Sequence, residues 1–330
     1  ATPARRADLR PDLMAKRAPF EIGDTTAPAG RRTQTELPIA RLMSGTPVAL
    51  PVIVLHGRTD GPTVWVNAAT HGDEIIGVEI IRRAIGALDA KTLSGTVLAV
   101  PVVNVFGFNA GDRFLPDRRD LNRSFPGAPR GSLAGRIANL MMTEVVSRCE
   151  AGIDLHSGSD HRANLPQIRG DLEDERTLEL ATAFGAPIAI DSRVRDGSLR
   201  GAATEAGATC LLYEGGEAYR FDETAITTGV DGTLRVLHRL GMIDEVVPPA
   251  APPRIATSSR WVRASRSGIV DCRLPLGTEV EKGEQMGVLR DPFGKQLGRL
   301  KAPADGVLIG RLNHPLVNRG DAILHVAQTR

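Results

Sequence analysis

The chain is poor in cysteine and aromatic residues, and it has no long apolar run. Its three cysteines, Cys149, Cys210 and Cys272, include no Cys-x-x-Cys pair, which excludes a disulfide framework or a cysteine-based zinc site and is typical of a reducing compartment. No apolar run approaches the roughly 18 residues of a membrane span, and the N-terminus lacks the apolar core of a signal peptide. We therefore predict a cytoplasmic protein that does not bind membranes.

An excess of charge of one sign is also lacking. The formal net charge is +2, and acidic and basic residues are interspersed, so no basic block predicts a nucleic-acid partner. With 330 residues, the chain exceeds the roughly 250 to 300 residues that one hydrophobic core comfortably serves. We expect one main domain with a smaller domain attached.

A proline-rich stretch marks the boundary between these two domains. Four of the six residues from 248 to 253 are proline, which is typical of an extended linker. We predict an N-terminal extension (1–45), a main domain (46–247), the linker (248–254) and a second domain (255–330). Residues 1–13, ahead of Met14, are rich in arginine and proline, and we assign them no function.

In the main domain, short β-branched runs alternate with helical patterns. The alternation predicts an α/β fold, a mixed sheet flanked by helices, in which ligands bind beyond the carboxyl ends of the strands. The predicted helices begin after the His71 loop, at Leu133 and at Asp222 as N-cap, and the last of them stops at Gly241. The predicted strands are residues 52–55, 63–68, 96–103, 153–155, 187–190 and 209–213.

The second domain contains an internal repeat. Gly-Ile-Val and Val-Glu-Lys-Gly, within 268–283, are echoed by Gly-Val-Leu and Val-Asn-Arg-Gly, within 306–320, which predicts two interlocked halves of a small all-β domain. The pattern resembles the barrel-sandwich hybrid of biotinyl and lipoyl domains. Those carriers present a modified lysine on a hairpin, but residues 290–295 here form an ordinary turn signal, so a carrier function is not expected.

Side chains suited to binding a metal follow three of the predicted strands. His71 and Glu74 lie in a His-Gly-Asp-Glu motif after the second strand, His156 follows a later strand, and Glu214 ends another. A catalytic zinc takes three nitrogen or oxygen ligands and keeps a position for water, beside which a general-base carboxylate must sit. The pattern predicts one Zn²⁺ per chain with Glu214 as the base.

Simpler explanations exist for each of these residues. His71 and Glu74 could be a surface histidine beside a helix-start carboxylate, and His156 could be a core histidine with one satisfied nitrogen. Asp154, on the same strand face as His156, could orient an imidazole. We expect Glu217 to be a solvated loop charge. Polar residues from His161 to Arg169 could contact a substrate or form a solvated loop, and we treat His56, His238, His314 and His325 as structural.

With Asp-Leu-Asn-Arg at 120–123 and Asp-Leu-His at 154–156, the chain resembles the zinc carboxypeptidase superfamily. It is most similar to the succinylglutamate desuccinylase and aspartoacylase branch, over about residues 50 to 242, and the appended β-domain is also similar to that branch. Arg113, Arg118 and Arg119 all lie in the loop that would supply a carbonyl-polarising arginine. The resemblance implies His71, Glu74 and His156 as zinc ligands, Glu214 as general base, Asn122 and Arg123 as substrate anchors, and Arg113 as the polarising residue.

One departure concerns tyrosine. Members of this family close the site with a tyrosine, which in aspartoacylases comes from the C-terminal domain, but residues 248–330 contain none. The chain has two tyrosines, Tyr213 and Tyr219. Because Tyr213 should point to the side of its strand opposite Glu214, Tyr219 is the candidate substrate-binding tyrosine.

The resemblance implies a zinc-dependent amidohydrolase that removes an acyl group from a small N-acylated amino acid or related amide. The alternative is a metallocarboxypeptidase acting on short or isopeptide-linked peptides, and a third reading is a non-catalytic module that retains a metal. The expected partner is a small-molecule N-acyl amino acid, and a homo-oligomer is left open.

Overall fold

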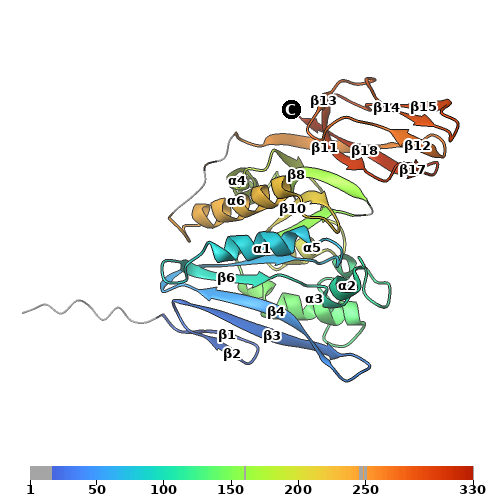
Figure 1. Ribbon diagram of the computed structural model, residues 1–330. Coiled ribbons are helices and arrows are strands. Elements are labelled where there is room, and N and C mark those ends of the chain that lie inside the picture. The colour runs from blue at the N-terminus through green and yellow to red at the C-terminus, as the bar shows by residue number, and fades with distance from the viewer. Residues whose placement is uncertain (1–16, 160, 245–247, 249–250, 330) are drawn as a thin grey trace, which may run out of the picture.

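A single mixed sheet of twelve strands runs through the molecule (Figure 1). The computed structural model describes residues 17–159, 161–244, 248 and 251–329. The α/β class is as predicted. In spatial order the strands are β3 (Arg31–Arg41), β4 (Pro47–His56), β6 (Ser94–Val100), β5 (Thr59–Ala68), β7 (Ala151–Gly158), β10 (Thr209–Glu217), β8 (Arg162–Gly170), β9 (Ile188–Asp191), β11 (Arg254–Arg263), β18 (Ala322–Thr329), β16 (Gly306–Leu312) and β13 (Glu279–Val280).

The strand directions define one functional edge of this sheet. Strands β6, β5, β7 and β10 are parallel to one another, whereas β8 runs antiparallel to β10. The carboxyl ends of β5, β7 and β10 therefore lie at the same edge, where ligands of open α/β sheets bind.

Helices cover both faces of the sheet. One hydrophobic core lies under α1, α4 and α6, and a second lies under α3 and α5. Alternate residues of β5 pack into the two cores: Val64 and Val66 face the first core, and Trp65 faces the second. No helix in the described residues is long and apolar enough to cross a membrane. The helices are α1 (Ile76–Gly86), α2 (Val105–Ala110), α3 (Leu133–Glu144), α4 (Glu175–Phe184), α5 (Leu199–Glu205) and α6 (Glu223–Arg239), with 3-10 turns at Leu121–Arg123 and Val146–Arg148.

The three predicted helices are confirmed as α1, α3 and α6. Asp222 caps α6 by accepting a hydrogen bond from the Ala225 backbone N–H, and Gly241 follows its end with a φ of 71°. The sequence analysis did not predict α2, α4, α5 or β8. Strand β8 has no clean alternation of polar and apolar residues because its polar residues Asn164 and Gln167 are buried inside the protein.

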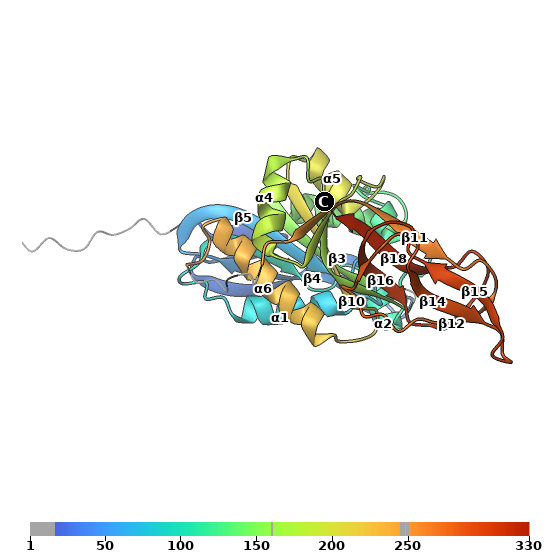
Figure 2. The ribbon, with the colours of Figure 1, turned by 90° about the horizontal axis from the view of Figure 1, so that it is seen from above.

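The C-terminal domain is a small all-β unit whose two halves interlock. A four-stranded sheet lies beside the strands of the main sheet. The repeats pair crosswise, with β12 against β17 and β13 against β16. Because β11 pairs with β9 and β16 pairs with β8, the main sheet continues into this domain (Figure 2). The four-stranded sheet contains β15 (Gln296–Lys301), β14 (Gln285–Arg290), β12 (Gly268–Asp271) and β17 (Leu316–Val317).

Part of the segment that we assigned to an N-terminal extension belongs to the main sheet. Strand β3 pairs with β4 along its length, and a hairpin of β1 (Phe20–Ile22) and β2 (Thr25–Ala27) buries Ile22 and Ala27 against the second core. The sequence reading missed β3, which carries exposed arginines at its start. Residues 1–13, and residues 249 and 250 of the predicted proline-rich linker, lie outside the described residues.

Two helical glycines give a test of this packing. A Cβ at Gly232, on α6, would lie 2.2 Å from the ring of Phe184 on α4, whereas a Cβ at Gly86 would meet nothing within 4 Å. Gly232→Ala should lower the free energy of unfolding by about 1 to 3 kcal/mol through overpacking. Gly86→Ala should raise it by up to about 1 kcal/mol through helix propensity. Urea unfolding curves measure both, and equal effects of the two variants would contradict the close approach of α4 and α6.

Candidate active site

The register of three parallel strands brings the predicted site residues together. On β7, His156 is paired with Glu214 of β10, and Asp154 is paired with Asn67 of β5. Side chains of paired residues leave the sheet on the same face. His156 and Glu214 therefore enter the same space, although they are far apart in sequence.

The turn after β5 delivers the other two candidate ligands. Ala69 has a φ of 49°, which is uncommon for a residue with a Cβ, and its carbonyl accepts a hydrogen bond from Asn104 N. A Cβ at Gly72 would lie 2.0 Å from the carbonyl carbon of Gly107, so no side chain fits at position 72. Helix α2 thus packs directly onto the loop and fixes the positions of His71 and Glu74.

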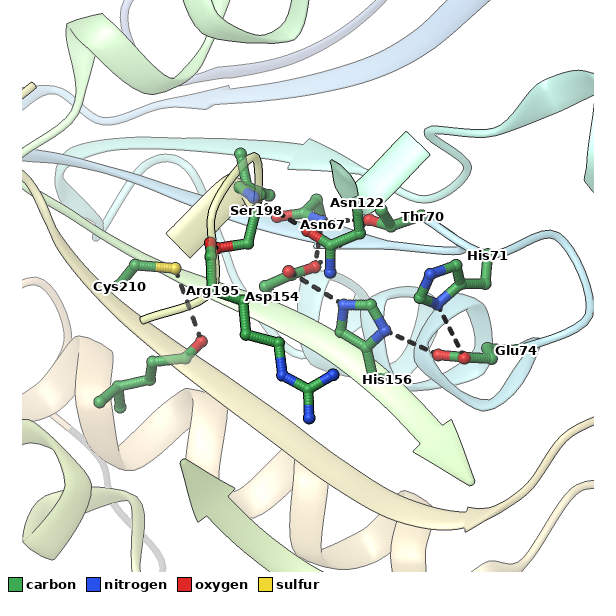
Figure 3. Close-up of polar contacts among 12 residues, drawn as sticks. Asn67, Thr70, His71, Glu74, Asn122, Asp154, His156, Arg195, Ser198 and Cys210 are labelled. Atoms are coloured by element: carbon green, nitrogen blue, oxygen red, sulfur yellow. Dashed lines mark hydrogen bonds and ion pairs between the residues drawn. The ribbon is translucent and has the colours of Figure 1, made fainter. Parts of the chain in front are cut away.

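His71, Glu74 and His156 converge on one point (Figure 3). Each offers one ligand atom, and these atoms lie within 4.8 Å of one another. Glu74 Oε1 is 2.8 Å from Nδ1 of His71, and Glu74 Oε2 is 2.7 Å from Nδ1 of His156. All three side chains are buried, so the arrangement is not that of a surface histidine beside a helix start.

A second carboxylate lies behind each imidazole. Nε2 of His71 is 3.0 Å from Asp120 Oδ1, and Nε2 of His156 is 3.0 Å from Asp154 Oδ2. Asp154 in turn accepts a hydrogen bond of 2.6 Å from the Asn67 side chain. An imidazole that donates its Nε2–H to a carboxylate keeps the Nδ1 lone pair for a metal. The outer carboxylates thus select the tautomer that metal binding needs.

The donor set fits a divalent metal. Within the described residues, Nδ1 of His71 is buried without a hydrogen-bond partner, despite its closeness to Glu74. Burial alone would raise the pKa of Glu74, but the two imidazoles outweigh it and hold that pKa well below its ordinary value. The electrostatic field therefore keeps Glu74 ionised between two nitrogens. Two imidazoles and a carboxylate are a typical ligand set of a catalytic zinc.

Glu214 lies beside this cluster and is left free for another role. Burial raises the pKa of Glu214 above its ordinary value, and the nearby charge of Arg169 opposes that rise. Oε2 of Glu214 accepts a hydrogen bond of 2.8 Å from the amide of Asn164. A buried carboxylate with a raised pKa can take up and return a proton nearer neutral pH than an exposed one.

Of the three arginines in the 113–120 loop, Arg113 reaches the cluster. Its Nη1 donates a hydrogen bond of 2.8 Å to Glu74 Oε1, and its Nη2 is 3.7 Å from Asp120 Oδ2. The side chains of Arg118 and Arg119 are 80% and 59% exposed and pair with aspartates of their own loop. The geometry thus favours Arg113 as the arginine that faces the reacting groups.

The predicted substrate-binding residues fall in two places. Asn122 and Arg123 line the same cavity as the metal cluster, and the Asn122 side-chain oxygen accepts a hydrogen bond from Leu199 N. Tyr219 is not among the lining residues of that cavity. Its ring is largely exposed, its φ is 59°, and its hydroxyl donates to the carbonyl of Gly111. The structure therefore ties Tyr219 to the α2 loop rather than to the cavity.

A cavity of about 780 Å³ contains the cluster, and both domains line it. Arginines dominate its walls. Arg200 is 7% exposed, its Nη2 donates to two backbone carbonyls, and its Nη1 has no hydrogen-bond partner within the described residues. The C-terminal domain contributes part of the wall. The charged and aromatic lining residues outside the metal cluster are Arg113, Arg123, Arg162, Arg169, Asp191, Arg193, Arg195, Arg200, Glu214, Trp261, Arg263, Asp321 and His325.

Several of these residues escaped sequence reasoning. Asp120 was visible in the Asp-Leu-Asn-Arg motif, but nothing in its spacing indicated a contact with His71. Asn164 and Arg169 belong to the polar stretch for which the sequence allows either a substrate contact or a solvated loop. The structure places both residues on β8 against the cavity. Arg195 and Arg200 gave no signal, since they lie on and beside a short helix that the sequence pattern did not predict.

The sequence of this chain is similar to those of known proteins. The family described as "Succinylglutamate desuccinylase/Aspartoacylase catalytic domain" matches residues 60–240. The chain is 31% identical over 305 residues to the N-alpha-acetyl-L-2,4-diaminobutyric acid deacetylase of Halomonas elongata, covering 85% of this chain and 86% of the relative.

Solved structures show the same fold over nearly the whole chain. A succinylglutamate desuccinylase/aspartoacylase from Rhodobacter sphaeroides superposes with a TM-score of 0.81 at 28% identity, covering 91% of this chain and 96% of the other. The product-bound ectoine utilization protein EutE (DoeB) from Ruegeria pomeroyi gives a TM-score of 0.81 at 25% identity, with 91% and 97% covered.

The ligand assignment can be tested by metal content. His71→Ala removes one of three ligands and should leave the purified protein with little zinc after dialysis against trace metal, as measured by elemental analysis. Asp120→Asn should keep zinc but bind it roughly 10- to 100-fold more weakly, because the imidazole loses its orienting carboxylate. His238→Ala, an exposed change on α6, is the matched control. Full zinc occupancy in His71→Ala would refute the assignment.

Proposed function

The chain belongs to the succinylglutamate desuccinylase/aspartoacylase family, and on that premise we propose that it is a zinc-dependent amidohydrolase removing an acyl group from a small N-acylated amino acid. The observation that carries the proposal is the pairing of His156 with Glu214 across β7 and β10. This register puts a carboxylate that is not one of the candidate ligands beside a buried His–Glu–His cluster. A metal ligand set with an adjacent base is the minimal machinery of metal-assisted hydrolysis.

Zinc, held by His71, Glu74 and His156, would polarise the scissile carbonyl and lower the pKa of the attacking water. Support for zinc comes from the two Nδ1 atoms aimed at one buried carboxylate and from the outer aspartates on both Nε2 atoms. The family resemblance points to the same ion.

Glu214 would move the proton. As general base it takes a proton from the attacking water, and as general acid it returns that proton to the departing amine, so the products are a carboxylic acid and a free amino compound. Burial favours this exchange because it raises the pKa of the carboxyl group. Arg113, whose guanidinium lies against Glu74, would donate to the oxyanion that forms as the carbonyl is attacked.

The charge of the cavity supports an anionic substrate. Its lining arginines outnumber its lining carboxylates, and a guanidinium binds a carboxylate through two parallel hydrogen bonds. Asn122 and Arg123 would anchor the carboxylate of the amino acid. The relative from Halomonas elongata is named for an N-acetylated amino acid, which is consistent with this substrate class, and a cavity of about 780 Å³ suits such a molecule.

The base is tested by Glu214→Gln, which keeps the shape of the side chain but removes its proton affinity. The variant should retain zinc and lose at least about 100-fold in kcat, because general-base assistance contributes ~10²- to 10⁴-fold. Steady-state kinetics and elemental analysis on the same sample measure both. A nearly unchanged kcat would remove Glu214 as the base.

The substrate class is tested with a zinc-loaded panel of N-acetyl-L-2,4-diaminobutyrate, N-acetyl-L-aspartate, N-succinyl-L-glutamate and simple dipeptides. At least one acyl amino acid should be hydrolysed with a higher kcat/KM than any dipeptide. Replacing its α-carboxylate by a neutral carboxamide should raise KM, because the arginines lose their partner. A preference for dipeptides would instead support a carboxypeptidase, and equal turnover of the carboxamide would contradict the anchoring role of Arg123.

A further inference from the structure

One buried amide contacts Glu214 and has no part in the machinery described so far. Nδ2 of Asn164 donates a hydrogen bond of 2.8 Å to Glu214 Oε2. Asn164 is 9% exposed and lies on β8, the strand between β10 and the C-terminal domain (Figure 1). The contact therefore joins the carboxylate to the strand on which the two domains meet.

The strand neighbours of Asn164 leave room for this contact. Asn164 is paired with Gly216 on β10 and with Gly310 on β16, a strand of the C-terminal domain. A Cβ at Gly310 would lie 3.2 Å from Asn164 Oδ1 and 3.1 Å from the Cβ of His325. A side chain at position 310 would therefore press on the Asn164 amide. The C-terminal domain thus borders the space that Asn164 occupies.

We propose, on the premise that Glu214 is the general base, that Asn164 is a positioning residue for it and that strand β16 of the C-terminal domain keeps Asn164 in place. The Asn164 amide occupies Oε2 of Glu214, which leaves Oε1 to face the reacting water. Without this hydrogen bond, the carboxylate can rotate among several orientations, and only part of its population points at the water. The C-terminal domain then contributes to the reaction rate as well as to the cavity wall.

A double-mutant cycle tests the proposal on zinc-loaded protein with the best-hydrolysed of the three acyl amino acids above. Asn164→Ala should lower kcat about 10- to 100-fold, as expected for a lost hydrogen bond to a charged group, with KM within about twofold. In the Glu214→Gln background, the same change should alter kcat by less than about twofold, because Asn164 acts through Glu214. Asn164→Asp, which keeps the volume but replaces the donor by a second carboxylate that repels Glu214, should lose at least as much kcat as Asn164→Ala.

The chain offers a matched control. Asn313 donates a hydrogen bond of the same 2.8 Å length to Glu217 Oε2, at the end of β10. Asn313→Ala removes an amide–carboxylate contact of the same length, which joins the two domains but does not involve Glu214, and should leave kcat unchanged. Gly310→Ala should lower kcat in the wild-type background and have little further effect in Asn164→Ala.

The possible results distinguish a failure of the proposed function from a failure of the positioning role of Asn164 alone. If Glu214→Gln leaves kcat intact, the proposed function and this inference both fail. If Glu214→Gln is slow but Asn164→Ala is as fast as the wild type, only the inference fails. An equal loss from Asn164→Ala in both backgrounds, or a raised KM at constant kcat, would overturn the positioning role and make Asn164 a substrate contact or a purely structural residue. Thermal melting and zinc content identify a variant that misfolds; if Asn164→Ala misfolds, the same cycle with Asn164→Asp in the wild-type and Glu214→Gln backgrounds decides.

Discussion

The site depends on one buried carboxylate held between two imidazoles. Glu74 is enclosed by protein, and burying an isolated carboxylate is costly unless it is paired. His71 and His156 provide that pairing, and each is backed by an aspartate. The result is a chain of hydrogen-bonded polar groups that runs from the Asn67 amide through Asp154 and His156 to Glu74. Such a network fixes the ligand atoms before a metal arrives, which limits the reorganisation that binding requires.

The continuity of the sheet holds the C-terminal domain beside the candidate site. A domain joined only by a linker could move away from the site, but here β11 and β16 hydrogen-bond to β9 and β8. Strand β8 therefore has β10 on one side, and on the other side it pairs with β9 of the main domain and with β16 of the C-terminal domain. Its polar residues are buried at that junction. This explains why a strand without regular alternation of polar and apolar residues lies in the interior of the sheet.

The sequence was informative where the chemistry demands particular residue types at strand ends. His71, Glu74, His156 and Glu214 could be found because each follows an apolar strand, and the strand order then brings them together. Asp120 could not be assigned, since its contact with His71 depends on how a 3-10 turn packs, which no local pattern encodes. Strand β8 and helix α5 were missed because their polar residues face a cavity, so the usual correspondence between burial and hydrophobicity fails there.

The C-terminal domain has no tyrosine, and other aromatic side chains contribute to its part of the cavity wall. At the cavity wall this domain presents Trp261, which is stacked on His325 with ring centroids 4.1 Å apart, and the guanidinium of Arg162 lies 5.8 Å from the Trp261 ring centroid. Burial, followed by the charge of Arg169, lowers the pKa of His325 to about 3, so this imidazole is neutral near pH 7. A phenol could exchange a proton with a substrate, but an indole N–H and a guanidinium only donate hydrogen bonds. The wall therefore offers hydrogen-bond donors to an anion, which is consistent with the proposal that Glu214 carries the proton.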